Sequence, residues 1–192
     1  MEYFDIYDET GKKTNKQALR GTKLQDGEFQ LIVNVWIRNA KGEYLIQQRN
    51  KKTDDIPYMW ATTAGVVTKG DTSLETAVKE TVEEIGVNLV KENLQLVKRY
   101  FVVDDYGNNI MDVYLINQDI GLDELVIDNT EVKQCKLATI QEIKTMIKNK
   151  LFWDYEEIAQ DKDYFKLIEK SWSNENFIYW RCFRNKRDGS IT

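Results

Sequence analysis

Histidine is absent from the 192 residues of this chain. This absence removes the side chain that most often moves protons near neutral pH, and with it any Ser-His or Cys-His catalytic pair. Proline occurs once, at Pro57. The two cysteines, Cys135 and Cys182, lie far apart and lack the close spacing of a metal or redox pair. We therefore expect two reduced thiols.

Long apolar runs and an excess of basic residues are also missing. No stretch approaches the length of a membrane span. The amino terminus has neither the basic start nor the apolar run of a signal peptide. The net charge is −5 and no long basic run occurs, which argues against a dedicated nucleic-acid surface. With 42% hydrophobic and 31% charged residues, we expect a soluble globular protein. Since signal and membrane segments are missing, a cytoplasmic enzyme is the default expectation.

A capped helix within Gly65–Val87 is the clearest local signal. Thr72 with Glu75 three residues later is a capping box, which marks a helix start. Gly86 is typical of the residue just past a helix end. The periodicity between these signals is helical. We expect the residues from Gly65 to the helix to form a glycine-bearing loop.

Three glutamates of this helix gather on one side. At about 100° per residue, Glu80, Glu83 and Glu84 fall within an arc of roughly 100°. We expect the opposite face to be buried through Leu74, Val78, Val82 and Ile85. Like charges at these spacings destabilise a helix, so a purely solvent-facing surface would place lysines among them. Clustered carboxylates suit a hard divalent cation such as Mg²⁺.

The stretch resembles the Nudix box, Gly-x5-Glu-x7-Arg-Glu-U-x-Glu-Glu-x-Gly-U, in which U is a bulky aliphatic residue. The positions that match are Gly65, Glu80, Glu83, Glu84, Gly86 and Val87. Asp71 stands in place of Glu, Lys79 in place of Arg, and Thr81 in place of U. The resemblance implies an α/β Nudix fold, with a mixed β-sheet sandwiched between helices.

The resemblance also implies a function, the hydrolysis of a diphosphate linked to another group, often a nucleoside. The implied cofactor is Mg²⁺, with Mn²⁺ as the alternative ion. The implied metal ligands are Glu80, Glu84, Glu83 and a carbonyl at Gly65. The implied catalytic residues are Glu83, Lys79 and Asp71. Lysine offers a point charge where the arginine fork would orient a carboxylate, so we expect metal binding to be retained and turnover to be less efficient.

The general base and the substrate contacts are not specified by the box. Candidate bases elsewhere in the chain are Asp104, Asp105, Asp112 and Glu131. Trp60, Asp112 and Glu131 are weak candidates for substrate binding. Packing is the better interpretation of Trp60, which follows Pro57 in a Pro-x-x-Trp approach to the box that resembles many Nudix proteins.

We expect a single domain over residues 1–192, with an N-terminal arm (1–28), a Nudix core (29–150) and a helical extension (151–192). Strands are expected at Tyr3–Tyr7, Phe29–Ile37, Glu43–Gln48, Leu94–Val103, Ile110–Asn117 and Val132–Leu137. The polar segment up to Gly27 carries no clear signal. A second capping box, Thr139 with Glu142, predicts a helix to about Asn149. Further helices are expected at Asp154–Gln160 and Asp163–Trp172.

Two other functions are compatible with parts of the pattern. The N-terminal arm resembles that of isopentenyl-diphosphate isomerase, but no cysteine lies between Trp60 and Val87, and Gln30, Asn34 and Val66 stand where relatives often have histidine. A non-catalytic module that binds a nucleotide or sugar is favoured modestly by Asp71 and Lys79. The aromatic segment Phe177–Phe183 is compatible with a homodimer surface.

Overall fold

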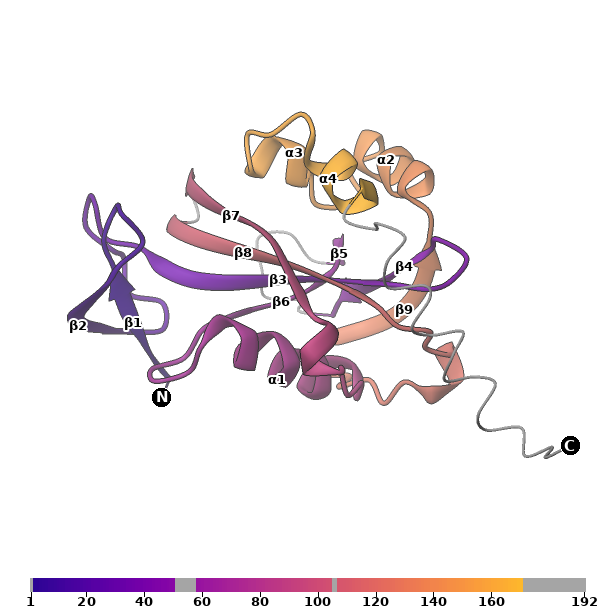
Figure 1. The fold of residues 1–192 in the computed structure, drawn as a ribbon, viewed down its shortest axis with the longest axis horizontal. Helices are drawn as coiled ribbons and strands as arrows, with labels where there is room; N and C mark the ends of the chain where they lie inside the picture. The colour runs from indigo at the N-terminus through magenta and orange to yellow at the C-terminus, as the bar shows by residue number, and fades with distance from the viewer. Residues whose placement is uncertain (1, 51–57, 105–106, 171–192) are drawn as a thin grey trace, which may run out of the picture.

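The computed structural model describes residues 2–50, 58–104 and 107–170. Its central feature is a mixed β-sheet organised around β3, Gln30–Arg38 (Figure 1). β3 runs parallel to β8, Gly107–Asn117, and antiparallel to β6, Thr63–Val66. The other strands of this sheet are β4 (Tyr44–Arg49), β5 (Trp60–Ala61), β7 (Gln95–Asp104) and β9 (Val132–Ala138). The strand order is β5-β4-β3-β8-β7, with β6 on β3 and β9 on β4.

Helices cover both faces of this sheet, as Figure 1 shows. α1, Ser73–Ile85, lies on one face. The other face carries α2 (Ile140–Lys148), α3 (Tyr155–Ile158) and α4 (Tyr164–Lys170). Side chains of β3 alternate between the two cores: Val33 and Val35 pack with the α1 layer, and Trp36 packs with the other helices. The predicted mixed sheet sandwiched between helices is confirmed.

Both predicted capping boxes are present. The backbone N–H of Glu75 donates to Thr72 Oγ1, and the Thr72 N–H donates back to the Glu75 carboxylate. Thr139 and Glu142 make the same pair at the start of α2. Gly86 ends α1 with a φ of 72°, the left-handed conformation that glycine adopts most readily. These ends are local features, which is why the sequence predicted them.

The buried face of α1 agrees with the prediction at Ile85, and Leu74 and Val78 pack against the core as partly buried residues, but Val82 does not. Val82 is 39% exposed, whereas Ala77, Thr81 and Glu84 are buried. The helix packs against β3 and β6 through small residues, which allow the backbones to approach closely and turn Val82 outward. The Thr81 hydroxyl donates to the Ala77 carbonyl oxygen (2.7 Å), so this buried polar group is hydrogen-bonded.

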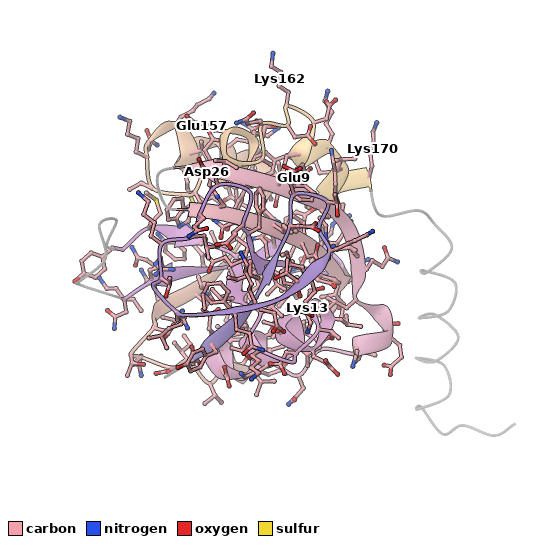
Figure 2. The ribbon with its side chains drawn as sticks, turned by 90° about the vertical axis from the view of Figure 1, so that its left-hand side faces the viewer. Glu9, Lys13, Asp26, Glu157, Lys162 and Lys170 are labelled. Carbon is pink, nitrogen blue, oxygen red and sulfur yellow. The ribbon has the colours of Figure 1, made fainter. Side chains whose placement is uncertain are left out.

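The first strand of the chain belongs to a hairpin that the sequence did not reveal. β1, Tyr3–Tyr7, was predicted, but its partner β2, Lys13–Leu19, is polar and almost entirely exposed. The hairpin has a small core of Phe4, Ile6 and Ala18, with Val66 packed against it. Figure 2 views the molecule from the hairpin side, with Lys13 on the hairpin and Lys162 pointing away from the α3–α4 layer.

One prediction about the box region needs correction, and several others concern residues outside the described ranges. The residues around Gly65 form strand β6 rather than a loop. Phe177–Phe183, Pro57 and Asp105 lie outside the described residues. Short 3₁₀ turns occupy Lys91–Asn93 and Leu122–Glu124. Among the described helices, none has both the length and the apolar character required to traverse a bilayer.

Aromatic packing holds the α2–α4 layer on the sheet. Trp36 makes edge-on or tilted ring contacts with Tyr44, Phe152, Tyr155, Tyr164 and Phe165. Its indole N–H donates to the Tyr164 hydroxyl (2.9 Å), which donates in turn to Asn34 Oδ1 (3.0 Å). Trp60 belongs to the same buried cluster, as expected for a packing residue. Asn34, which stands where isomerase relatives often have histidine, is thus a core residue.

Asp161 gives this layer a pH-dependent anchor on β7. Lys98 Nζ and the Tyr100 hydroxyl both donate to Asp161 Oδ2 at 2.8 Å. These hydrogen bonds, the one from Lys98 first, lower the Asp161 pKa from 3.8 to about 2. The two hydrogen bonds to the Asp161 carboxylate therefore stabilise the fold fully above the ordinary pKa of 3.8. This stabilisation is lost as the pH falls through the lowered pKa of about 2.

We expect Asp161→Asn to reduce the free energy of unfolding at about pH 5 and to reduce it much less at about pH 2. The reason is that the wild-type carboxylate, ionised at pH 5, takes up its proton as the pH falls toward 2 and loses the same interactions. Urea unfolding of both proteins at the two pH values measures the difference. A deficit of equal size at both values would contradict the assignment.

Candidate functional site

A pocket of about 350 Å³ opens beside the carboxyl-terminal half of α1. Five parts of the chain line it: the N-terminal hairpin, the end of β4, β6, α1 and the segment before β9. The lining residues are Glu2, Arg20, Arg49, Ala64, Gly65, Glu80, Glu83, Glu84, Asp128 and Glu131. Acidic side chains thus dominate the pocket, and they come from regions that are distant in sequence.

The closest packing in the pocket is between Gly65 and Glu80. A Cβ atom at position 65 would collide with the carboxyl group and Cγ of Glu80. Because glycine has no side chain, the Glu80 carboxylate can lie directly against the backbone of β6. This contact places the Glu80 carboxylate beside the backbone of Gly65, as would be required if both groups bound the same ion.

Glu84 lies one turn farther along α1 and is only 9% exposed. Gln47 of β4 donates through Nε2 to Glu84 Oε2 at 2.7 Å. The Thr63 hydroxyl in turn donates to Gln47 Oε1 at 3.2 Å. This chain of hydrogen bonds from the sheet fixes the orientation of the Glu84 carboxylate.

Burial raises the pKa of both glutamates. The pKa of Glu84 is raised to about 8 by burial and by the nearby charges of Glu80 and Glu131, against the hydrogen bond from Gln47. The pKa of Glu80 is raised to about 7, first by burial and then by the charge of Glu83.

Nearby cations oppose these shifts without cancelling them. The charges of Lys79 and Arg20 act on Glu80 in this sense, and the charge of Arg49 acts so on Glu84. Carboxyl groups with strongly raised pKa values are more typical of functional sites than of structural ion pairs.

The donor set fits a hard divalent cation in its chemistry. Carboxylate oxygens and a backbone carbonyl are the ligands that Mg²⁺ prefers, and Glu80, Glu83, Glu84 and Gly65 all line the pocket. Within residues 2–50, 58–104 and 107–170, no three acidic side chains are already arranged around one ion position. Ion binding therefore requires these carboxylates to turn toward a common point.

Other predicted site residues lie outside this pocket lining. Asp71 accepts a hydrogen bond from the Thr68 hydroxyl (2.6 Å) in the turn before α1. Lys79 is exposed on α1 and acts on Glu2 and Glu80 through its charge. Trp60 is in the core. Thus the box positions at 71 and 79 do not join the acidic cluster in this structure.

Among the four candidate bases, only Glu131 is a described lining residue of the pocket. Asp112 is fully buried and accepts two hydrogen bonds from Arg99, at 2.6 and 2.8 Å. This fork-like pair is a structural ion pair within β7 and β8. Asp104 is the last residue of β7, and Asp105 lies outside the described residues.

Five lining residues were not predicted from the sequence: Glu2, Arg20, Arg49, Ala64 and Asp128. Asp128 is brought to the pocket because its N–H donates to the Glu84 carbonyl oxygen (3.0 Å), while the Val126 N–H donates to the Ile85 carbonyl oxygen (3.0 Å). The segment before β9 thus clasps the end of α1. Arg49 directly follows the predicted strand Glu43–Gln48 and is the last residue of β4, which is a weak signal. Nothing in the sequence singles out Glu2 or Arg20.

The comparison with protein families decides the assignment. A family model described as NUDIX domain matches residues 28–161. The chain belongs to the Nudix family. An uncharacterized Nudix hydrolase of Listeria monocytogenes is 31% identical over 147 residues, covering 76% of this chain and 85% of the relative. Nudix hydrolase 3 of Arabidopsis thaliana is 31% identical over 156 residues, covering 76% of this chain but 20% of that protein.

Solved structures show the same Nudix fold at lower identity. A protein of Deinococcus radiodurans has a TM-score of 0.61 and 18% identity, covering 90% of this chain and all of that one (100%). A MutT protein of Methanosarcina mazei has a TM-score of 0.59 and 16% identity, covering 76% of this chain and 96% of that one. The predictions of the family, of its fold and of an enzyme of the Nudix hydrolase class are confirmed.

The Gly65 contact leads to a prediction about ion binding. Gly65→Ala should displace the Glu80 side chain and weaken Mn²⁺ or Mg²⁺ binding by at least about 10-fold, since perturbing the support of a ligand typically costs that much. Isothermal titration with each ion measures the affinity, and far-UV circular dichroism checks that the fold is intact. Unchanged ion affinity in a folded variant would rule out a ligand role for the Gly65–Glu80 pair.

Proposed function

We propose that this Nudix hydrolase uses a divalent cation, Mg²⁺ with Mn²⁺ as the alternative, to cleave the diphosphate linkage of a nucleoside diphosphate joined to another group. The observation that carries the proposal is a pair of glutamates one turn apart on α1, the half-buried Glu80 against the backbone of Gly65 and the buried Glu84 in the same pocket. Their raised pKa values reflect burial first and the charges of neighbouring acids second.

Glu80 and Glu84 would hold the ion, with Glu83 and the backbone at Gly65 as further ligands. When bound, the ion would neutralise phosphate charge and lower the pKa of a coordinated water. Gln47 would keep the Glu84 carboxylate oriented toward the ion through its 2.7 Å hydrogen bond. These roles follow the box positions and the packing around them.

Glu131 is the proposed proton acceptor. It lines the pocket from the segment before β9, and its charge acts on Glu80 and Glu84. A carboxylate at this place can take the proton of the attacking water while Glu80 and Glu84 remain engaged. Asp112 is unsuited to this role because Arg99 occupies both of its oxygens.

Lys79 and Asp71 would support the site indirectly. The ammonium of Lys79 favours the charged form of Glu80 and so opposes the rise in its pKa. Because lysine is a point charge, this support is electrostatic and lacks the directed hydrogen bonds of an arginine. Asp71 would hold the turn before α1 through the Thr68 hydroxyl.

A nucleotide sugar is a suitable first probe for the reaction. The NUDIX domain of NrtR from Shewanella oneidensis was crystallised with ADP ribose and has a TM-score of 0.54 and 16% identity to this chain, a likeness of fold alone. Substrates should therefore be screened across nucleoside triphosphates, dinucleoside polyphosphates, nucleotide sugars and prenyl diphosphates. Binding of a diphosphate without cleavage of any of them would favour a non-catalytic module.

Replacing Glu84 tests the proposed mechanism. Glu84→Gln should lower Mg²⁺-dependent hydrolysis of the best substrate by at least about 100-fold, because the amide removes an anionic ligand while keeping the shape of the side chain. Phosphate release under matched ion concentrations measures the loss. Glu92→Gln, at an exposed position outside the pocket, is the matched control. Full activity of Glu84→Gln would refute the ligand assignment.

A further inference from the structure

The N-terminal hairpin reaches the pocket although it precedes the segment matched by the family model. That match begins at residue 28, whereas Glu2 directly precedes β1 and Arg20 directly follows β2, side by side at the open end of the hairpin. Both side chains line the same pocket as Glu80, Glu83 and Glu84. The lining of the site is therefore completed by a part of the chain that the box does not include.

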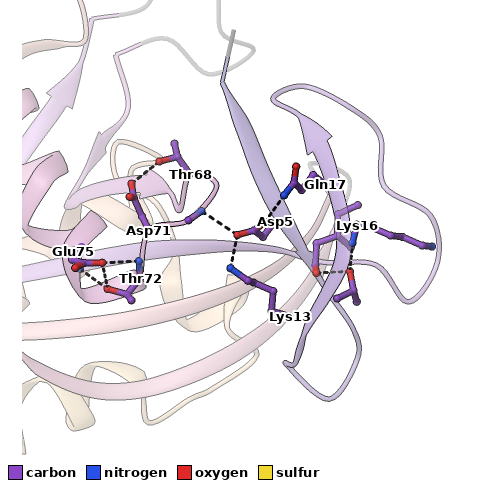
Figure 3. A network of polar contacts seen from close by, with 11 residues as sticks. Asp5, Lys13, Lys16, Gln17, Thr68, Asp71, Thr72 and Glu75 are labelled. Atoms are coloured by element: carbon purple, nitrogen blue, oxygen red, sulfur yellow. Dashed lines mark hydrogen bonds and ion pairs between the residues drawn. The ribbon is translucent and has the colours of Figure 1, made fainter.

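The hairpin is held firmly against the turn that leads into α1. The Asp5 carboxylate accepts hydrogen bonds from the Gly70 N–H (3.1 Å), Lys13 Nζ (2.7 Å) and Gln17 Nε2 (3.3 Å), as Figure 3 shows. The Lys69 N–H also donates to the Tyr3 carbonyl oxygen at 2.7 Å. Asp5 itself is buried, whereas its partners Lys13 and Gly70 are exposed. Arg20 is thus presented to the pocket by a docked element.

Arg20 is suited to an anionic ligand by charge and geometry. Among the described lining residues, the cations are Arg20 and Arg49, and the other charged groups are carboxylates. Arg20 Nη1 donates to Glu2 Oε2 at 2.7 Å, which uses one of the five N–H donors of the guanidinium. The side chain is 55% exposed, and the charges of Glu80 and Glu131 act on it from across the pocket.

We propose that Arg20 binds a phosphoryl oxygen of the substrate, so that the N-terminal hairpin is part of the substrate site. This inference rests on the function proposed above. A diphosphate entering a pocket rich in carboxylates needs positive charge on the side that the ion does not cover. Arginine supplies it as a planar fork that matches two phosphoryl oxygens, and Glu2 keeps the guanidinium at the pocket rim.

The test compares Arg20→Ala and Arg20→Lys with the wild-type enzyme. Calorimetry with imidodiphosphate and Mg²⁺ measures binding, and steady-state hydrolysis of the best substrate from the screen measures KM and kcat. Loss of a charge-assisted hydrogen bond predicts that Arg20→Ala weakens binding and raises KM by about 10- to 100-fold, with a smaller change in kcat. Arg20→Lys should recover part of this loss, since lysine keeps the charge without the fork.

Lys16→Ala is the matched control. Lys16 lies on the same hairpin and makes an exposed ion pair with Glu28 at 2.7 Å, outside the pocket lining. This variant should match the wild type in binding and KM. Thermal unfolding of each variant separates lost binding from a loosened hairpin.

The outcomes distinguish the two proposals. If the wild-type enzyme cleaves a diphosphate substrate and Arg20→Ala has the same KM and the same affinity for imidodiphosphate, the role of Arg20 is refuted and the proposed function stands. If Arg20→Lys restores binding completely together with the unfolding temperature, the role is the structural ion pair with Glu2, which also overturns the inference. If the wild type cleaves none of the screened substrates, the proposed function itself fails.

Discussion

The contact between Gly65 and Glu80 is the constraint on which the candidate site depends. The bare backbone of β6 allows α1 to approach until the Glu80 carboxylate lies against the strand. Ala77 and Thr81 extend the same close packing along the helix, and the Thr81 hydroxyl returns its hydrogen bond to the helix backbone. One face of α1 therefore serves two purposes, since it packs on the sheet and carries the carboxylates into the pocket.

The charges of this protein fall into two physically different groups. Asp112 is fully buried but is neutralised by the two hydrogen bonds from Arg99, which is the arrangement expected of a structural pair. Glu84 is nearly as buried, yet its hydrogen-bond partner is a neutral amide, and the charges of Glu80 and Glu131 outweigh that of Arg49. Such a site stores unfavourable electrostatic energy that a bound cation would relieve, and this difference separates the candidate site from the rest of the core.

The hairpin and the segment before β9 shape the pocket from outside the helix and β6. Asp5 joins the hairpin to the Gly70 backbone, and Asp128 joins the other segment to the Glu84 carbonyl. In both cases a backbone N–H, not a side chain of a recognisable motif, is the donor. Such contacts depend on the path of the chain in space and leave no spacing pattern in the sequence.

The sequence by itself determined the features that arise from neighbouring residues. The capping boxes at Thr72 and Thr139, the end of α1 at Gly86, the apolar strands and the box spacing all depend on interactions within a few positions. They were sufficient to predict the family, the fold and the gathering of Glu80, Glu83 and Glu84 on one side of α1. Only the tertiary structure decided how far α1 is rotated, and so which side chains it buries. It also paired Asp112 with Arg99 and brought Arg20 to the pocket. Those outcomes depend on packing and charge between segments far apart in the chain, which local periodicity does not record.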